Sequence, residues 1–112
     1  MFEPETMLAE PVAAPIDRER FRRLTEQWKA ETRFLSSTTA IAEHPAYREI
    51  VAMGEAVLPL IFDDLSRNPG QWYSALAILT GENPVAEADR GKIHAMTRAW
   101  LEWGVLHGYL TP

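Results

Sequence analysis

Apolar residues recur at helical spacing in five segments of this 112-residue chain, and no segment alternates polar and apolar residues as a strand would. The first segment predicts a helix over residues 18–34, with Asp17 as its N-cap. Its buried stripe is expected to consist of Phe21, Leu24, Trp28 and Leu35.

The next three segments are separated by proline and glycine. Pro45 is expected to start a second helix that ends at Gly54, because proline suits the first helical position and glycine the position after the last. A third helix starts at Glu55 and ends before a turn at residues 68–70, and a fourth covers residues 71–80. The fourth is apolar almost all round, which is typical of a central helix.

The fifth segment predicts a helix over residues 90–107, capped by Asp89. Its buried face is expected to hold Ile93, Met96, Trp100, Trp103 and His107. The predicted fold is therefore all-α, a compact bundle of four to five helices. Residues 17–112 are expected to form one helical domain, and residues 1–16, with three prolines and three glutamates, a flexible tail.

The run MGEAVLPLI, from Met53 to Ile61, resembles the helical hairpin of HEAT-like repeats, in which a glycine turn leads into Leu-Pro and an apolar second helix. The segment from Trp72 to Gly81 resembles the start of a next unit. A solenoid needs three or more repeats, so the resemblance implies a bundle that uses one such hairpin.

A wider set of short motifs spans nearly the whole domain. They are Trp28 with Glu31-Thr32, Ser36-Ser37, His44 to Tyr47, Met53-Gly54, Trp72 with Ala75-Leu76, Thr80 to Pro84, and Ala99 to Gly104. Together they resemble a family of small uncharacterised bacterial proteins. The resemblance implies a bacterial cytosolic origin, and because such small genes often lie beside a second small gene, it favours a protein partner.

Composition is that of an ordinary globular protein, with 46% hydrophobic and 24% charged residues. The chain has no cysteine, which excludes disulfides and thiolate metal sites. No basic residue precedes Arg18, unlike in a signal peptide, and no run approaches the roughly 20 apolar residues of a membrane span. We therefore expect a cytoplasmic protein that does not act at a membrane.

Charge is unevenly distributed along the chain. The net charge is −5, yet residues 17–35 hold six basic and four acidic residues. The side chains of Arg18, Arg22, Lys29 and Arg33 fall within roughly 60° of one another on a helix. Such a stripe is most simply a solvated face. Docking to an acidic protein partner is the second interpretation, and nucleic-acid binding the third, because a nucleic-acid surface is normally larger and less neutralised.

Two apolar features predict an interaction surface. The fourth helix has more apolar surface than one hairpin covers, so Trp72 or Tyr73 is expected to remain accessible. On the fifth helix, Leu101 and Val105 lie off the main buried stripe, on the side of His94 and Arg98. An exposed strip of this kind marks a partner-binding surface or a homodimer contact, unless the N-terminal segment covers it.

Candidate catalytic chemistry is sparse. The three histidines have no zinc-ligand spacing, so no metal or cofactor is expected. Asp63 and Asp64 point about 100° apart on a helix and cannot share a proton; Asp63 should face solvent and Asp64 the edge of the core. A small hydrolytic or ligand-binding enzyme would need His44 beside the consecutive hydroxyl residues Ser36, Ser37, Thr38 and Thr39. Turn and capping chemistry explains the same four residues.

The preferred interpretation is a non-enzymatic protein–protein interaction module, which regulates or neutralises a partner encoded nearby in the manner of an antitoxin or immunity protein. Its anchors would be Trp72, Tyr73, Leu101 and Val105, while the basic stripe steers an acidic partner. The enzyme with a site near His44 is the alternative, and nucleic-acid binding through the first helix is a third hypothesis. Homo-oligomerisation alone would also cover the apolar strip.

Overall fold

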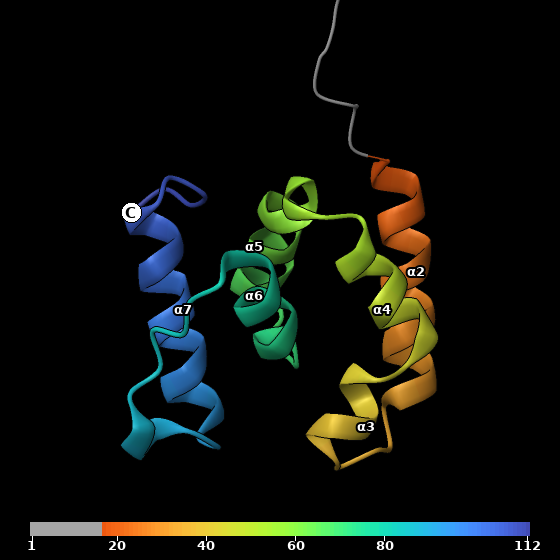
Figure 1. The fold of residues 1–112 in the computed structure, drawn as a ribbon, viewed down its shortest axis with the longest axis horizontal. Coiled ribbons are helices and arrows are strands. Elements are labelled where there is room, and N and C mark those ends of the chain that lie inside the picture. The colour runs from red at the N-terminus through yellow and green to blue at the C-terminus, as the bar shows by residue number, and fades with distance from the viewer. Residues whose placement is uncertain (1–16) are drawn as a thin grey trace, which may run out of the picture.

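The computed structural model describes residues 17–112, and this part of the chain is all-α with no strand (Figure 1). The six α-helices and two turns of 3-10 helix are α2 (Arg18–Thr32), α3 (Thr38–Ala42), α4 (Pro45–Ala52), η1 (Glu55–Val57), α5 (Leu58–Arg67), α6 (Tyr73–Thr80), η2 (Glu87–Asp89) and α7 (Ile93–Leu106). The all-α prediction is confirmed. The flexible tail expected over residues 1–16 lies outside the described residues.

Helix α2 begins as expected and ends two residues early. The Asp17 carboxylate accepts the backbone N–H of Arg20 at 2.9 Å, which is the usual N-cap contact. The helix stops at Thr32, and the N–H of Leu35 turns back to the Thr32 carbonyl at 2.9 Å. Leu35 therefore leaves the helix, and 47% of its surface is exposed. Its expected place on the buried stripe was wrong.

The hydroxyl cluster after α2 forms a short helix, α3, where the sequence predicted only caps or an irregular turn. The Ser37 hydroxyl accepts the N–H of Ala40 at 3.2 Å, so the capping role is confirmed. The helix itself is stabilised by a tertiary contact: Ile41 is buried, and its carbonyl accepts the indole N–H of Trp28 at 3.0 Å. That contact outweighs the weak helix propensity of Ser and Thr.

Helix α4 starts at Pro45 with His44 as its N-cap, as predicted. The His44 Nδ1 accepts the N–H of Ala46 at 3.1 Å, and its Nε2 lies 2.7 Å from Oε1 of Glu31. A neutral imidazole with its proton on Nε2 satisfies both contacts. Gly54 follows the helix with a φ of 84°, a left-handed conformation that favours glycine.

The last two helices are shorter than predicted. Trp72 is the N-cap of α6 and lies outside the helix, while Gly81 ends it with a φ of 74°. The expected cap of α7 by the Asp89 side chain was wrong. Asp89 belongs to η2, and its backbone carbonyl accepts the N–H of Lys92 at 3.0 Å. This turn uses residues 90–92 and delays the start of α7 to Ile93.

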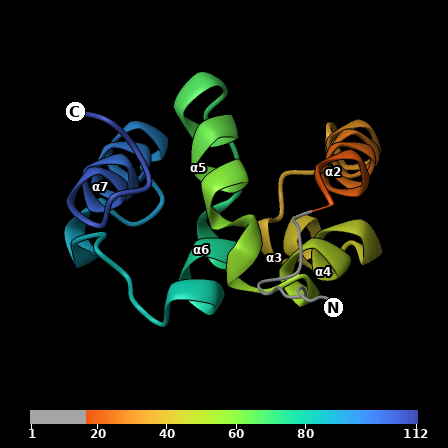
Figure 2. The same ribbon diagram turned by 90° about the horizontal axis from the view of Figure 1, so that it is seen from above.

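The helices form a row. Helix α2 packs along α4, α4 contacts α6, and α5 contacts both α6 and α7. Figures 1 and 2 show α2 and α4 at one side, α5 and α6 in the middle and α7 at the other side. The buried apolar side chains of the described residues form one continuous cluster along this row. The resemblance of the hairpin after Met53 to HEAT-like repeats stays a prediction.

Candidate functional site

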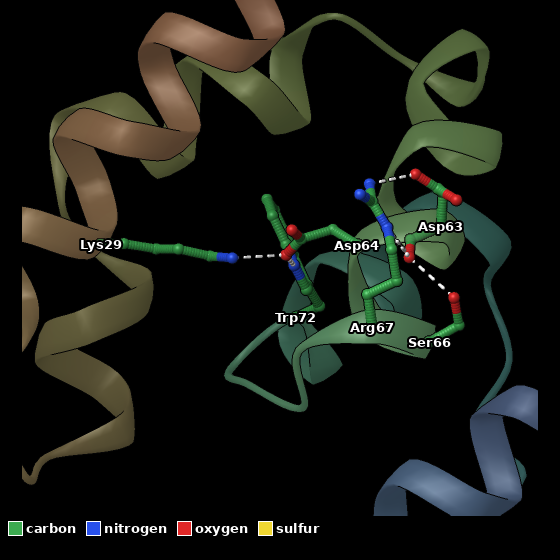
Figure 3. A network of polar contacts seen from close by, with 6 residues as sticks. All are labelled: Lys29, Asp63, Asp64, Ser66, Arg67 and Trp72. Atoms are coloured by element: carbon green, nitrogen blue, oxygen red, sulfur yellow. Dashed lines mark hydrogen bonds and ion pairs between the residues drawn. The ribbon is translucent and has the colours of Figure 1, made fainter.

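A salt bridge joins the first and middle parts of the row. Lys29 Nζ of α2 lies 2.6 Å from Asp64 Oδ2 of α5, and the indole N–H of Trp72 donates to the same oxygen at 2.8 Å. Figure 3 shows Lys29 reaching across to Asp64 with Trp72 beside the carboxylate. One oxygen thus links α2, α5 and the start of α6.

The two adjacent carboxylates differ as expected. The side chain of Asp64 is 15% exposed, whereas that of Asp63 is 60% exposed and pairs with Arg67 one turn further along α5 (Figure 3). Asp63 therefore faces solvent and Asp64 lies at the edge of the core. Each carboxylate already has a cationic partner, which leaves neither as an isolated acid or base.

Two hollows flank the Lys29–Asp64 bridge. One, of about 290 Å³, lies between the N-terminal half of α2 and α5, over Phe21 and Leu60. The other, of about 490 Å³, lies between the C-terminal half of α2, α3 and the turn at residues 68–71, over Trp28 and Ile41. Lys29 lines both hollows, so we describe them together as the α2–α5 cleft.

The four basic residues predicted to share one face all line this cleft. Arg18, Arg22 and Lys29 line the smaller hollow, and Lys29 and Arg33 the larger one. Arg22 pairs with Glu19 and, at 3.0 Å, with Glu26. Their carboxylates, Glu19 most, raise the pKa of the Arg22 guanidinium above its ordinary value.

Arg18 and Arg33 differ from the two central cations. Within residues 17–112 neither has an ion pair, whereas Lys29 is bound to Asp64. The Arg33 guanidinium instead lies 5.2 Å from the ring centroid of Phe34. The cleft therefore has a neutralised centre and a cation available at each end.

The C-terminal end of the cleft is bordered by apolar surface that the sequence did not predict. Phe34 is 90% exposed and Leu35 47% exposed, although both belong to the segment predicted to be helix or buried stripe. The early end of α2 explains both exposures. The signal was present in the hydroxyl run that begins at Ser36, because its caps compete with continuation of the helix.

Trp72 was expected to be an accessible anchor, and this was wrong. Its side chain is 0% exposed, stacks with Phe21 at 5.8 Å and lies 4.6 Å from Trp28 between ring centroids. Tyr73 is half-buried, and its hydroxyl shares a hydrogen bond with that of Thr97 at 2.8 Å. The large apolar residue of α6 that is exposed is Ile78, at 65%. Sequence periodicity could not choose among these apolar positions, since the helix is apolar almost all round.

The apolar strip predicted on the last helix is on the surface. Leu101 and Val105 are both half-buried and line a shallow hollow of about 350 Å³ on α7, together with His94, Arg98 and Glu102. Among the described residues, neither Arg98 nor Glu102 has an ion pair. This face of α7 therefore combines an apolar centre with two opposite, unpaired charges.

The residues of the enzyme hypothesis are engaged elsewhere. Both ring nitrogens of His44 have partners, Ala46 and Glu31, and no hydrogen bond joins His44 to residues 36–39 in the described part of the chain. His107 is exposed and stacks on Trp103 at 3.8 Å, where the sequence had placed it on the buried face. Residues 17–112 contain no group of three or more His, Asp or Glu side chains placed to hold a metal ion.

Comparison with protein-family models found no match, and searches among curated proteins and among solved structures found none either. Within residues 17–112 every helix is too short or too polar to cross a membrane. The site therefore has to be interpreted from its own geometry.

Proposed function

We propose that this protein is a non-enzymatic interaction module that binds an acidic segment of a protein partner in the α2–α5 cleft. The observation that carries the proposal is the convergence of Arg18, Arg22, Lys29 and Arg33 on one cleft whose base is apolar. Cations beside a desolvated aromatic and aliphatic base are the usual composition of a protein-binding surface.

The two cations without an ion pair in residues 17–112 set the length of the partner segment. Arg18 and Arg33 are fifteen residues apart at the two ends of α2, which at about 1.5 Å per residue separates their backbones by roughly 22 Å. An extended segment of about seven residues spans that distance, as does a helix of about four turns. Acidic residues near both ends of such a segment would meet Arg18 and Arg33.

The base of the larger hollow would hold an apolar anchor between the two contacts. Trp28 and Ile41 are buried there, and Leu35 with the neighbouring Phe34 can close over an inserted side chain. Apolar burial would provide most of the affinity, and the charges mainly association rate and orientation. Regulation or neutralisation of a partner encoded nearby is the use we infer for this binding.

The test is co-expression of the chain with its genomic neighbours, followed by light scattering to identify a complex of fixed stoichiometry. The double variant Arg18→Glu with Arg33→Glu should weaken that complex about tenfold or more and reduce its salt dependence, since exposed charge pairs contribute roughly 0.2–1 kcal/mol each and reversal makes them repulsive. Leu35→Asp should weaken it further by placing a charge at the apolar hollow.

The matched control is Arg23→Glu with Arg48→Glu. It makes the same change in charge at two exposed arginines that do not line the cleft. Equal weakening by both double variants, or a complex that none of the variants affects, would contradict the proposal. Binding of a DNA or RNA oligonucleotide with steep loss in salt would instead support a nucleic-acid surface on α2.

A further inference from the structure

A second surface, separate from the α2–α5 cleft, carries an inference of its own. The outward side chains of α7 follow a four-three-four spacing, His94, Arg98, Leu101 and Val105. That spacing is the seam along which two helices pack side by side. In the described part of the chain the seam is covered by no other helix, since its residues line an open hollow.

The charges on this seam are of opposite sign and form no ion pair within residues 17–112. Arg98 and Glu102 are four residues apart, yet neither has an ion pair with the other or with any described residue. Two other pairs at the same spacing, Arg22–Glu26 and Arg67–Asp63, do form. Arg22 precedes Glu26 just as Arg98 precedes Glu102, so spacing and orientation alone do not keep Arg98 and Glu102 apart. Within the described residues both groups remain available to a neighbour.

We propose that the occupant of this surface is a second copy of the chain, packed antiparallel against the first through α7. In a two-fold contact, a residue of one copy that meets a second residue of the other copy does so twice, once in each direction. With the helices antiparallel, Arg98 of each copy lies opposite Leu101 of the other and next to its Glu102. The seam therefore forms two equivalent Arg98–Glu102 pairs beside the two Leu101 side chains, and Val105 of each copy lies opposite His94 of the other.

The charge balance of the surface favours a copy over a partner of single charge. An acidic partner would repel Glu102 and a basic partner would repel Arg98, whereas a second copy satisfies both. Helix α7 has 14 residues and is about 21 Å long, so the contact is small. We expect a reversible dimer with a Kd on the order of 10–100 μM, at the weak end of specific interfaces.

Sedimentation equilibrium of the full chain tests the proposal, at protein concentrations from well below to well above that Kd. The mass should rise from 12.7 kDa toward twice that value. Arg98→Glu and Glu102→Arg should each weaken the dimer about tenfold or more, because each creates two like-charge contacts. The double variant should restore it to within about threefold, since the pair is then inverted in both copies. Circular dichroism of each variant checks that the helices are retained.

Two controls make the outcome decisive. Arg23→Glu makes the same charge change on an exposed residue of α2 and should leave the Kd unchanged. Ile78→Asp removes an exposed apolar side chain of α6 and should also leave it unchanged. A monomer at every concentration, no rescue by the double variant, or a dimer broken by Ile78→Asp would overturn the proposal. None of these results bears on partner binding in the α2–α5 cleft.

Discussion

The row of helices contains two aromatic clusters that are held together in different ways. The first lies between α2, α4 and α6 and contains Phe21, Trp28, Tyr47 and Trp72. The second lies between α5 and α7 and contains Phe62, Trp103, Tyr109 and His107.

Each polar aromatic group of the first cluster has a buried or half-buried partner. The Trp28 indole donates to the Ile41 carbonyl and the Trp72 indole to Asp64. The Tyr47 hydroxyl donates to the Gln71 carbonyl at 2.9 Å and accepts the N–H of Ala75 at 2.8 Å. These directional bonds specify how α4, α5 and α6 meet.

The second cluster depends more on close approach. Rings of Phe62, Trp103 and Tyr109 stack nearly parallel, and Gly104 lets α7 approach α5 without a side chain between them. Its one indole bond, from Trp103 to Glu82, is at 3.1 Å and lies near the surface. The comparison indicates that hydrogen bonds determine the geometry of the first cluster. Close packing of the rings and the small size of Gly104 determine the geometry of the second.

The largest expected effect is in the first cluster. Trp72→Ala should lower the free energy of unfolding by about 3–5 kcal/mol, because it leaves a cavity and removes a donor from Asp64. Trp103→Ala should lower the free energy of unfolding less, since Trp103 is 9% exposed and one of its stacking partners, His107, is itself exposed. Urea denaturation followed by circular dichroism measures both. A larger loss of stability for Trp103→Ala than for Trp72→Ala would show that the second cluster, not the first, contributes more to the stability of the fold.

The next effect isolates the directional bonds. Tyr47→Phe should cost about 1–3 kcal/mol, because the ring is retained while the Ala75 N–H and the Gln71 carbonyl lose their partner. The matched control is Tyr73→Phe, which removes one bond to the Thr97 hydroxyl from a half-buried residue and should cost about 1 kcal/mol or less. Equal costs would show that the Tyr47 bonds add no specific stabilisation.

The same tyrosine gives the first cluster a pH dependence. Burial raises the pKa of the Tyr47 hydroxyl above its ordinary value of about 10. The folded state therefore retains the proton where the unfolded state releases it. The stabilisation is complete below about pH 10 and is lost as the pH rises further. The free energy of unfolding should therefore fall more steeply above pH 10 for the wild type than for Tyr47→Phe. Parallel pH profiles of the two proteins would contradict this assignment.

The smallest effect tests the second cluster. A Cβ at residue 104 would lie 2.9 Å from Cδ1 of Phe62, whose ring is fully buried, and 3.1 Å from Cδ1 of Leu110. Gly104→Ala should therefore cost about 1–2 kcal/mol, after allowance for the better helix propensity of alanine. Phe62→Leu should lower the free energy of unfolding less in the Gly104→Ala variant than in the wild type, because it relieves the contact between the new methyl group and the Phe62 ring. Additive losses in the double-mutant cycle would exclude a direct clash.

Much of the fold was predictable from local sequence. The five predicted helices, the cap by Asp17, the start at Pro45 and the glycine stops at Gly54 and Gly81 are all observed. So are the separate environments of Asp63 and Asp64 and the surface position of Leu101 and Val105. Each of these depends on helical period or on the conformational limits of a single residue, and both act over a few residues.

Tertiary contacts decided the rest. Helical period identifies a buried face only where one side of a helix is polar, so it could not show that Trp72 is central and Ile78 exposed on the apolar α6. Nor could it bring Lys29 to Asp64, 35 residues away, or end α2 early enough to expose Phe34. The sequence by itself determined the helices and the face on which the cations lie. Only packing decided that this face borders a cleft, because a cleft exists between elements and no single helix encodes it.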